Sequence, residues 1–170
     1  MLKTAERLES LVRSVGLIAA WLTLVMVIVM TIVVAQRYFF DAGSIRLQES
    51  ITFMHAFVFL LASAYTLAAN DHVRVDIFYS RMNERQKALV NMGGTLLLLI
   101  PFCAFLIWTS WDFVSMSWSV QEASPESGGL PHPFPAIMKS FIPVAAGLLM
   151  AQGVVIMLRA AVVLTGKEYR

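Results

Sequence analysis

The chain has 170 residues, of which 58% are hydrophobic and only 14% are charged. A soluble domain must cover its surface with polar groups, and this composition is too apolar for that class of protein. The formal net charge of +2 is small, so the positions of the basic residues matter more than their sum. A single cysteine, Cys103, excludes a disulfide within the chain and a metal site built from several cysteines.

Four apolar stretches, each bounded by charged residues, are long enough to cross a bilayer. A spanning helix needs about 20 mostly apolar residues, and a helix pairs its own backbone groups where no water is present. The fourth stretch is the least apolar, because it contains Pro143 and Gln152, but it lengthens if Arg159 extends to the interface. The predicted fold is an all-α integral membrane protein with one domain, residues 1–170, and spans at 14–36, 50–70, 88–111 and 140–158.

The segment before the first span is also predicted to be helical. Hydrophobic residues recur at helical spacing between Leu2 and Val15, with charged residues largely on another face. This pattern predicts either a short amphipathic helix at the membrane interface or an extension of the first span. The apolar run that follows is longer than the core of a cleaved signal peptide, so we expect it to be retained.

The third helix is expected to continue beyond the membrane. Five residues spaced by three or four share one face, namely Trp108, Trp111, Ser115, Trp118 and Glu122. An aromatic stripe of this length predicts a projection that packs on another surface. The run from 123 to 135 contains four prolines and two glycines, which predicts an irregular loop.

The spans contain few groups that could do chemistry. No Asp, Glu, Lys or Arg lies within them, whereas ionisable groups in a span usually mark a transport path. His55 is the only histidine in a span, so a haem held by two histidines is not predicted, and we expect a packing or interface role. Gln152 is expected to hydrogen-bond to a neighbouring helix. Small residues that favour close helix packing are Gly16 with Ala20, Gly93 with Gly94, and Gly147 with Ala151.

Lysine and arginine are distributed unequally between the two sides of the membrane. Ten lie on the side of the termini and of the connection after the second span, and three lie on the other side. The positive-inside rule places the richer side in the cytoplasm, so both termini are predicted to be cytoplasmic. The ten are Lys3, Arg7, Arg13, Arg74, Arg81, Arg85, Lys87, Arg159, Lys167 and Arg170, and the three are Arg37, Arg46 and Lys139.

Three segments carry distinctive motifs. Arg37 is followed by an aromatic run and then by Gln48-Glu49 at the start of the second span, and residues 72–76 read His-Val-Arg-Val-Asp. The proline-rich loop leads into Lys139–Val144. These segments resemble the small membrane subunit, or DctQ-like subunit, of tripartite ATP-independent periplasmic (TRAP) transporters, with its patterns Arg…Trp-x-Glu-Glu and His-x-Arg-Val-Asp. Leu47 and Gln48 stand in place of the family's tryptophan and first glutamate, and the resemblance extends from about Leu8 to Arg159.

The resemblance implies assisted secondary transport across a bacterial inner membrane. A periplasmic binding protein delivers an organic acid to a large permease subunit, which imports it with sodium ions. The substrate and sodium sites belong to the large subunit, so no cofactor, metal or catalytic residue is expected in this chain, and no nucleic acid partner. This subunit is expected to scaffold the large one and to help dock the binding protein.

The residues expected to serve these roles fall into three groups. The candidates for docking or for the partner interface are Arg46, Glu49, Trp111, Trp118 and Lys139. The motif after the second span consists of His72, Arg74 and Asp76, and Gln152 is the packing group within the membrane.

Two other functions remain open at this point. A membrane anchor for an oxidoreductase that binds quinone or haem suits four helices with many aromatic residues, but not a single membrane histidine. A small exporter acting as a dimer conflicts with the absence of charge from the spans. A visible spectrum of the purified protein distinguishes the anchor from a transporter subunit.

Reporter fusions test the predicted topology. We expect cytoplasmic signals from fusions at Met1, Asp76 and Arg170, and periplasmic signals from fusions at Gly43 and Gly129. A periplasmic signal at Asp76 would overturn the four-span arrangement, because that position lies between the second and third spans.

Overall fold

The structure, a computed structural model, describes residues 2–69 and 79–165. In these residues it is helical, without strands. Four helical stretches are long and apolar enough to cross a membrane, which confirms the expected all-α fold with four spans. The elements are α1 (Leu2–Phe40), α2 (Ile45–Ala68), α4 (Glu84–Gly94), the π-helix η1 (Thr95–Leu99), α5 (Ile100–Ser119) and α6 (Phe134–Thr165).

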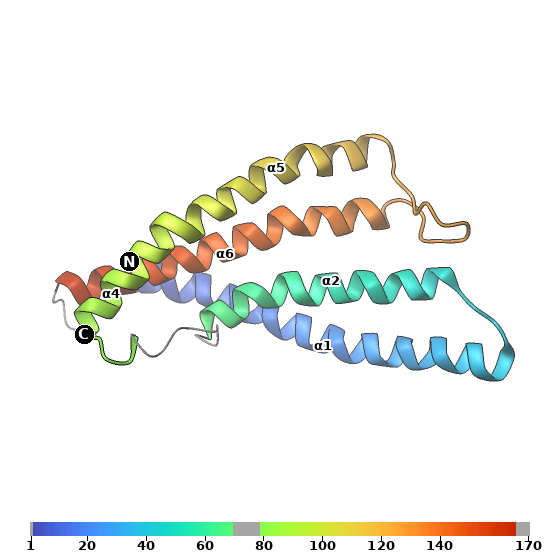
Figure 1. The fold of residues 1–170 in the computed structure, drawn as a ribbon, viewed down its shortest axis with the longest axis horizontal. Helices are drawn as coiled ribbons and strands as arrows, with labels where there is room; N and C mark the ends of the chain where they lie inside the picture. Colours follow the sequence, from blue (N-terminus) through green and yellow to red (C-terminus); the bar gives the residue numbers. More distant parts are fainter. Residues whose placement is uncertain (1, 70–78, 166–170) are drawn as a thin grey trace.

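The helices lie side by side in the order α1, α2, α6 and α5 (Figure 1). Helix α6 is central, since it contacts α1, α2, α4, η1 and α5, whereas α1 and α5 form opposite edges. The connections 41–44 and 120–133 lie together at one end, which we call the loop end. The described ends of α1 and α6 lie at the other, which we call the terminal end. There α1 passes behind α2 and meets α6 (Figure 1).

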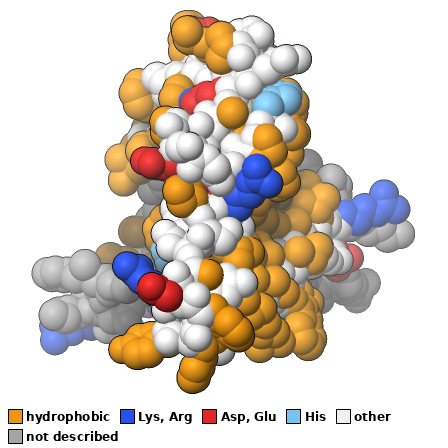
Figure 2. Space-filling view, turned by 90° about the vertical axis from the view of Figure 1, so that its right-hand side faces the viewer, with side chains coloured by type: hydrophobic (Ala, Val, Ile, Leu, Met, Phe, Trp, Pro, Cys, Tyr) orange, Lys and Arg blue, Asp and Glu red, His pale blue; other side chains and the backbone are white. Residues whose placement is uncertain are grey.

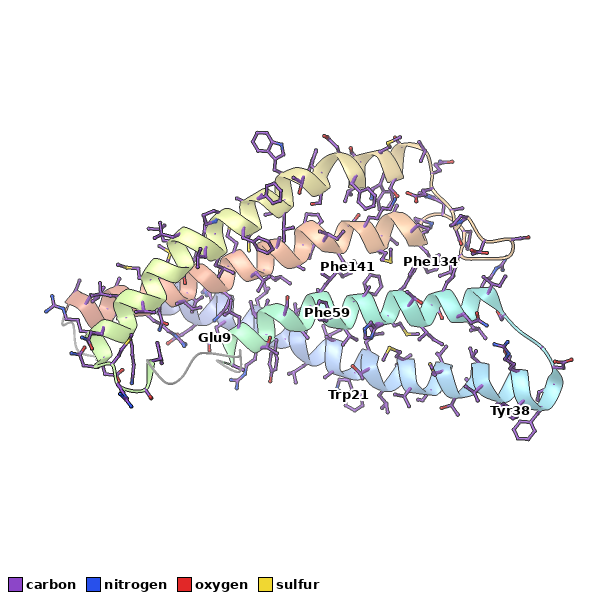
Figure 3. All side chains as sticks on the ribbon, in the orientation of Figure 1. Glu9, Trp21, Tyr38, Phe59, Phe134 and Phe141 are labelled. Carbon is purple, nitrogen blue, oxygen red and sulfur yellow. The ribbon has the colours of Figure 1, made fainter. Side chains whose placement is uncertain are left out.

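Most of the apolar surface faces outward. In the most apolar stretch of α6, 28% of residues are buried, compared with 6% in α1 and in α2. Trp21 and Tyr38 point away from the other helices (Figure 3) and are 70% and 86% exposed. A fold with so little enclosed interior depends on lipid or on partner proteins to cover its apolar side chains.

Helix α1 is continuous over 39 residues. Of the two alternatives for the N-terminal segment, the structure therefore has the extension of the first span. No proline interrupts this stretch, and Val12 and Ala19 are both buried against the other helices. Near its start, the Glu9 carboxylate forms an ion pair with Arg159 of α6. The fourth span was expected to be longer if the Arg159 side chain extended to the membrane interface. In the structure, that side chain has a carboxylate partner.

The third span is a helix from Glu84 to Ser119 that contains a π-helical segment. A capping box starts α4, in which the Gln86 backbone N–H donates to Asn83 Oδ1 at 2.9 Å and the Asn83 N–H donates to Gln86 Oε1 at 3.0 Å. The helix continues beyond Trp111, as predicted. Its π-helical part was not predicted.

Pro101 accounts for the position of the π-helix. A proline has no N–H to donate, and its ring clashes with the carbonyl four residues earlier, which here is Leu97. The wider π turn moves that carbonyl aside, and the Ile100 N–H bonds to the Thr95 oxygen five residues back. Pro101 itself then lies in the first turn of α5, where a proline is tolerated.

Two glycines allow close contact between helices. A Cβ on Gly16 would lie 2.4 Å from the Tyr65 ring of α2, and one on Gly153 of α6 would lie 3.1 Å from Thr95 of η1. The expectation for Gly16 is confirmed, whereas Gly153 was not singled out. Gly93, Gly94 and Gly147 make no such contact within the described chain, where nothing lies within 4 Å of their Cβ positions, so packing of these residues on a partner stays a prediction. A glycine pattern does not reveal which side of a helix faces its neighbour.

Replacement of Gly16 by alanine should weaken the contact between α1 and α2. The added methyl overlaps the Tyr65 ring, and overpacking of this kind typically costs about 1–3 kcal/mol. Thermal unfolding of the purified protein in detergent should shift to lower temperature for Gly16→Ala. Gly147→Ala is the matched control, since its methyl meets open space. Equal stability of the two variants would contradict the close approach at Gly16.

Candidate functional site

The loop end brings together most of the polar residues that the sequence singled out. Arg46 and Glu49 lie in the first turns of α2, Trp118 lies near the end of α5, and Lys139 lies near the start of α6. Viewed from this side, acidic and basic side chains are scattered among hydrophobic and uncharged ones (Figure 2). The connection 120–133 crosses this end, and several of these side chains hold it in place.

Glu49 binds the 120–133 connection to α2. The Ser124 hydroxyl donates to Glu49 Oε1, and the Leu130 backbone N–H donates to Glu49 Oε2 at 2.6 Å. Ser124 also accepts from the Glu126 N–H at 3.1 Å, and its own N–H donates to the Leu130 oxygen at 2.9 Å. Hydrogen bonds to an ionised carboxylate are stronger than those between neutral groups. Glu49 therefore fixes the conformation of a loop that has little regular structure of its own.

Glu122 forms a second attachment, between the end of α5 and α6. Its Oε2 accepts from the Ser117 hydroxyl at 2.6 Å and from the Lys139 ammonium group. The Lys139 Nζ also lies 4.0 Å from the centroid of the Phe113 ring, a cation–π distance. The Lys139 and Ser117 hydrogen bonds hold the pKa of Glu122 below its usual value. The stabilisation is therefore present at neutral pH and is lost as the pH falls through that lowered pKa.

Trp118 makes a third attachment. Its Nε1–H donates to the Ser140 hydroxyl of α6 at 3.0 Å, and its ring meets the His132 ring edge-on, with centroids 5.7 Å apart. Helix α5 ends one residue later, at Ser119, and Gln121 adopts a left-handed backbone with φ of 51°. The predicted helix face is therefore confirmed from Trp108 to Trp118. Glu122, the last residue predicted for that face, lies beyond the end of the helix.

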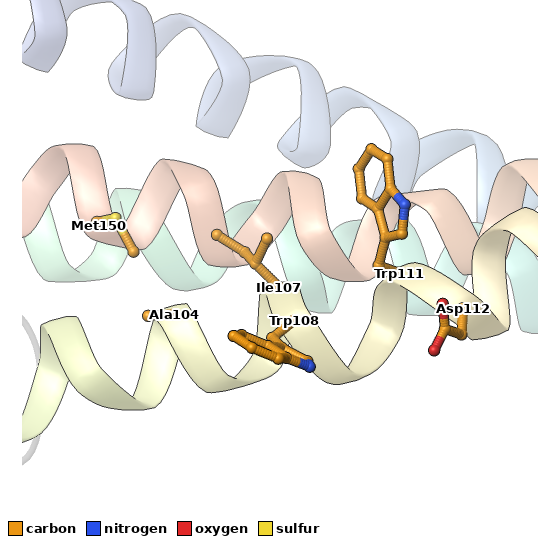
Figure 4. Close-up of a pocket in the computed structure, with 6 residues that line it drawn as sticks. All are labelled: Ala104, Ile107, Trp108, Trp111, Asp112 and Met150. Carbon is orange, nitrogen blue, oxygen red and sulfur yellow. The ribbon is translucent and has the colours of Figure 1, made fainter.

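Arg46 and Trp111 differ from the other candidates because both remain exposed. Arg46 makes no ion pair or hydrogen bond within the described chain, so neither of the nearby carboxylates, Asp41 and Glu49, is its partner there. Trp111 is 67% exposed. With Trp108 and Asp112 it borders a groove of about 460 Å³ between α5 and α6 (Figure 4). The loop end thus combines an internally fixed loop with an unpaired cation and exposed indole rings.

The remaining predicted residues lie elsewhere or outside the described chain. His72, Arg74 and Asp76 fall within 70–78, which the structure does not describe. Gln152 is 2% exposed, and its Oε1 has no donor within hydrogen-bond distance in the described residues. The hydrogen bond expected for that oxygen is therefore not formed within these parts of the chain. In the same residues, no three His, Cys, Asp or Glu side chains are grouped closely enough to hold a metal ion.

Sequence reasoning missed the internal roles of Glu49, Glu122 and Lys139. For Glu122 and Lys139, the signal that could have revealed them is their opposite charge at the two ends of the 120–133 connection. For Glu49, the signal is a carboxylate beside a loop that has too few backbone hydrogen bonds of its own. Glu9 and Arg159 likewise have opposite charges at the terminal end. The positions of charges along the chain indicate span limits and orientation, but they do not show which charges of distant segments pair.

Removal of the Glu49 carboxylate should release the loop. In Glu49→Ala, Ser124 and the Leu130 N–H lose their acceptor, and limited proteolysis between 120 and 133 should become several-fold faster while the helices remain intact. Glu126→Ala is the matched control, because that carboxylate lies in the same loop, is exposed, and accepts no hydrogen bond from the described chain. Cleavage at the same rate in both variants would contradict the anchoring role.

Comparison with protein families now gives the class of protein. A model of the family described as "Tripartite ATP-independent periplasmic transporters, DctQ component" matches residues 9–162, which is most of the chain and covers nearly all of the four membrane-spanning helices. Comparison with the curated proteins finds no match. The family is a transporter component and not an enzyme, which argues against the alternative of an oxidoreductase anchor. This multi-pass membrane chain belongs to the DctQ family, whose members are the small membrane subunits of TRAP transporters.

Proposed function

We propose that this chain is the small permease subunit of a sodium-coupled, binding-protein-dependent transporter that imports an organic acid across the bacterial inner membrane. It scaffolds the large permease subunit and helps to dock the periplasmic binding protein. Both termini lie in the cytoplasm, and the loop end faces the periplasm. Membership of the DctQ family supports the two protein partners, because a tripartite system requires two further components.

The scaffold role is supported by the absence of charged residues from the spans and by the small number of buried residues within them. Across 14–36, 50–69, 88–111 and 140–158 no side chain is an Asp, Glu, Lys or Arg. An organic anion and sodium ions need polar or charged partners inside a membrane. With few buried residues outside α6, the helices present broad apolar faces. Such a chain is suited to hold a transporting subunit in place, and the substrate and sodium sites belong to that subunit.

The docking role is supported by the contrast between fixed and free groups at the loop end. Glu49 and Glu122 fix the 120–133 connection, so this surface is already ordered before a partner arrives. Arg46 is exposed and unpaired in the described chain, and Trp111 is largely exposed. A binding protein that delivers substrate must also dissociate, which favours a modest, polar and salt-sensitive contact. Arg46 is the residue best placed to form an ion pair across it.

Charge reversal at Arg46 tests this function. Uptake is measured in proteoliposomes that contain this chain and the large subunit, at several binding-protein concentrations. For Arg46→Glu we expect half-maximal uptake at several-fold higher binding-protein concentration, with assembly unchanged, because charge pairs at an interface rim chiefly affect association. Arg85→Glu is the matched control, since it reverses an exposed charge at the terminal end.

The outcomes separate the two proposed roles. An unchanged concentration dependence for Arg46→Glu would remove Arg46 from the docking surface and leave the scaffold role standing. Sodium-driven uptake by this chain without the large subunit would instead contradict the scaffold role, because it would place the transport path within these four helices.

A further inference from the structure

A groove between α1 and α2 contains the one histidine of the spans. It has a volume of about 440 Å³, and Met26, Met30, Thr31, Thr52 and His55 contribute to its lining. The His55 side chain is exposed there, and it makes no hydrogen bond, ion pair or ring contact within the described chain. Both ring nitrogens of an imidazole form hydrogen bonds in either protonation state. His55 therefore lacks the partners that its chemistry requires.

The depth of His55 in the membrane makes this absence informative. It lies ten residues after Ile45 in α2 and five residues inside the predicted span 50–70, about 8 Å from the edge of that span. Hydrocarbon chains at this depth offer no hydrogen bond. Exposure of an imidazole to lipid inside a span is costly. A polar group of another protein segment is the partner that removes this cost.

The other side chains of the groove suit close contact with a helix. The Thr31 hydroxyl donates to the Val27 carbonyl at 2.9 Å and the Thr52 hydroxyl to the Gln48 carbonyl at 3.4 Å. Both threonines therefore satisfy their hydroxyls within their own helices and are small enough to allow close approach of another backbone. Met26 and Met30 are flexible and adapt to irregular partner surfaces. His55 is left as the group that requires a specific counterpart.

The groove between α5 and α6 provides a contrast. Its polar side chain, Asp112, lies beside Trp108 and Trp111 on the half of α5 nearer the loop end (Figure 4). Indole rings and a carboxylate near the end of a span lie at the headgroup region, where tryptophans are enriched and where the binding protein proposed above also reaches. Nothing in that groove requires a partner helix inside the hydrocarbon.

We propose that a transmembrane helix of the large permease subunit occupies the groove between α1 and α2 and hydrogen-bonds to His55. This inference rests on the proposed scaffold function and specifies the face through which it acts. The α1–α2 edge of the helix layer then contacts the large subunit, and the outer side of α5 faces lipid.

Photo-cross-linking in the assembled complex tests the position of the interface. A photoreactive benzoylphenylalanine is placed at Met30 in the groove or, as the matched control, at Phe105, which is exposed on α5. We expect an adduct with the large subunit from position 30 and none from position 105. An adduct from position 105 alone, or an adduct from position 30 only with lipid or with a second copy of this chain, would overturn the inference.

Substitution of His55 tests the hydrogen bond. Because His55 makes no hydrogen bond, ion pair or ring contact within the described chain, His55→Leu should leave the isolated subunit about as stable as before. It should lower the amount of large subunit that co-purifies by roughly threefold, the factor expected for an average hydrogen bond between membrane helices. His55→Asn should retain more of the partner, and Phe105→Leu should match the unmutated chain. Equal co-purification of His55→Leu and Phe105→Leu would overturn the role of His55.

These outcomes differ from failure of the proposed function. If the unmutated chain does not co-purify with the large subunit at all, the scaffold function itself is wrong. If it co-purifies but the adducts and the His55 variants behave like the controls, the large subunit binds through another face and the scaffold function stands.

Discussion

The arrangement of this subunit depends on the close contact of α6 with its neighbours. Hydrocarbon chains are as apolar as leucine, so helices in a membrane associate through packing at short range and not through escape from water. Accordingly, five of the eight buried residues of α6 are alanine or glycine, namely Ala136, Ala145, Ala146, Gly153 and Ala160. Without them, the α1–α2 pair would separate from the helix Glu84–Ser119, because α6 is the element that contacts both.

Charged and polar contacts fix this layer at its two ends. Glu9 and Arg159 connect α1 to α6 at the terminal end, whereas Glu122 connects the turn after α5 to Lys139 of α6 at the loop end. Between them the helices meet mainly through apolar and small side chains, as in the contact between the rings of Phe57 and Phe141, which are tilted by 41° with centroids 4.2 Å apart. The ion pairs therefore lie near the two ends of the helices, outside the most apolar part of the layer. The middle of the layer presents mainly apolar side chains, which contact another protein through shape.

The sequence predicted the spans well because span limits follow from a large energetic difference between charged and apolar residues in lipid. It predicted the helix ends less well. The energetic difference shows where the chain leaves the hydrocarbon, and this point need not be the end of the helix. A helix continues until its backbone is interrupted, as at Gln121, which has a left-handed φ. Periodicity also placed Trp108, Trp111 and Trp118 on one face. It could not show that Trp118 would bond to Ser140, because a pairing between distant segments depends on how the helices pack.

The π-helix Thr95–Leu99 has a consequence for the direction in which the tryptophans of α5 point. Such a segment is equivalent to one residue inserted into an α-helix, and each residue in an α-helix turns the chain by about 100°. Loss of a single residue between Thr95 and Leu99 would restore a regular helix and rotate all of α5 by about that angle relative to α4. Members of a family could thus turn the aromatic face of this helix toward a different neighbour through one short deletion, without altering the helix start at Asn83.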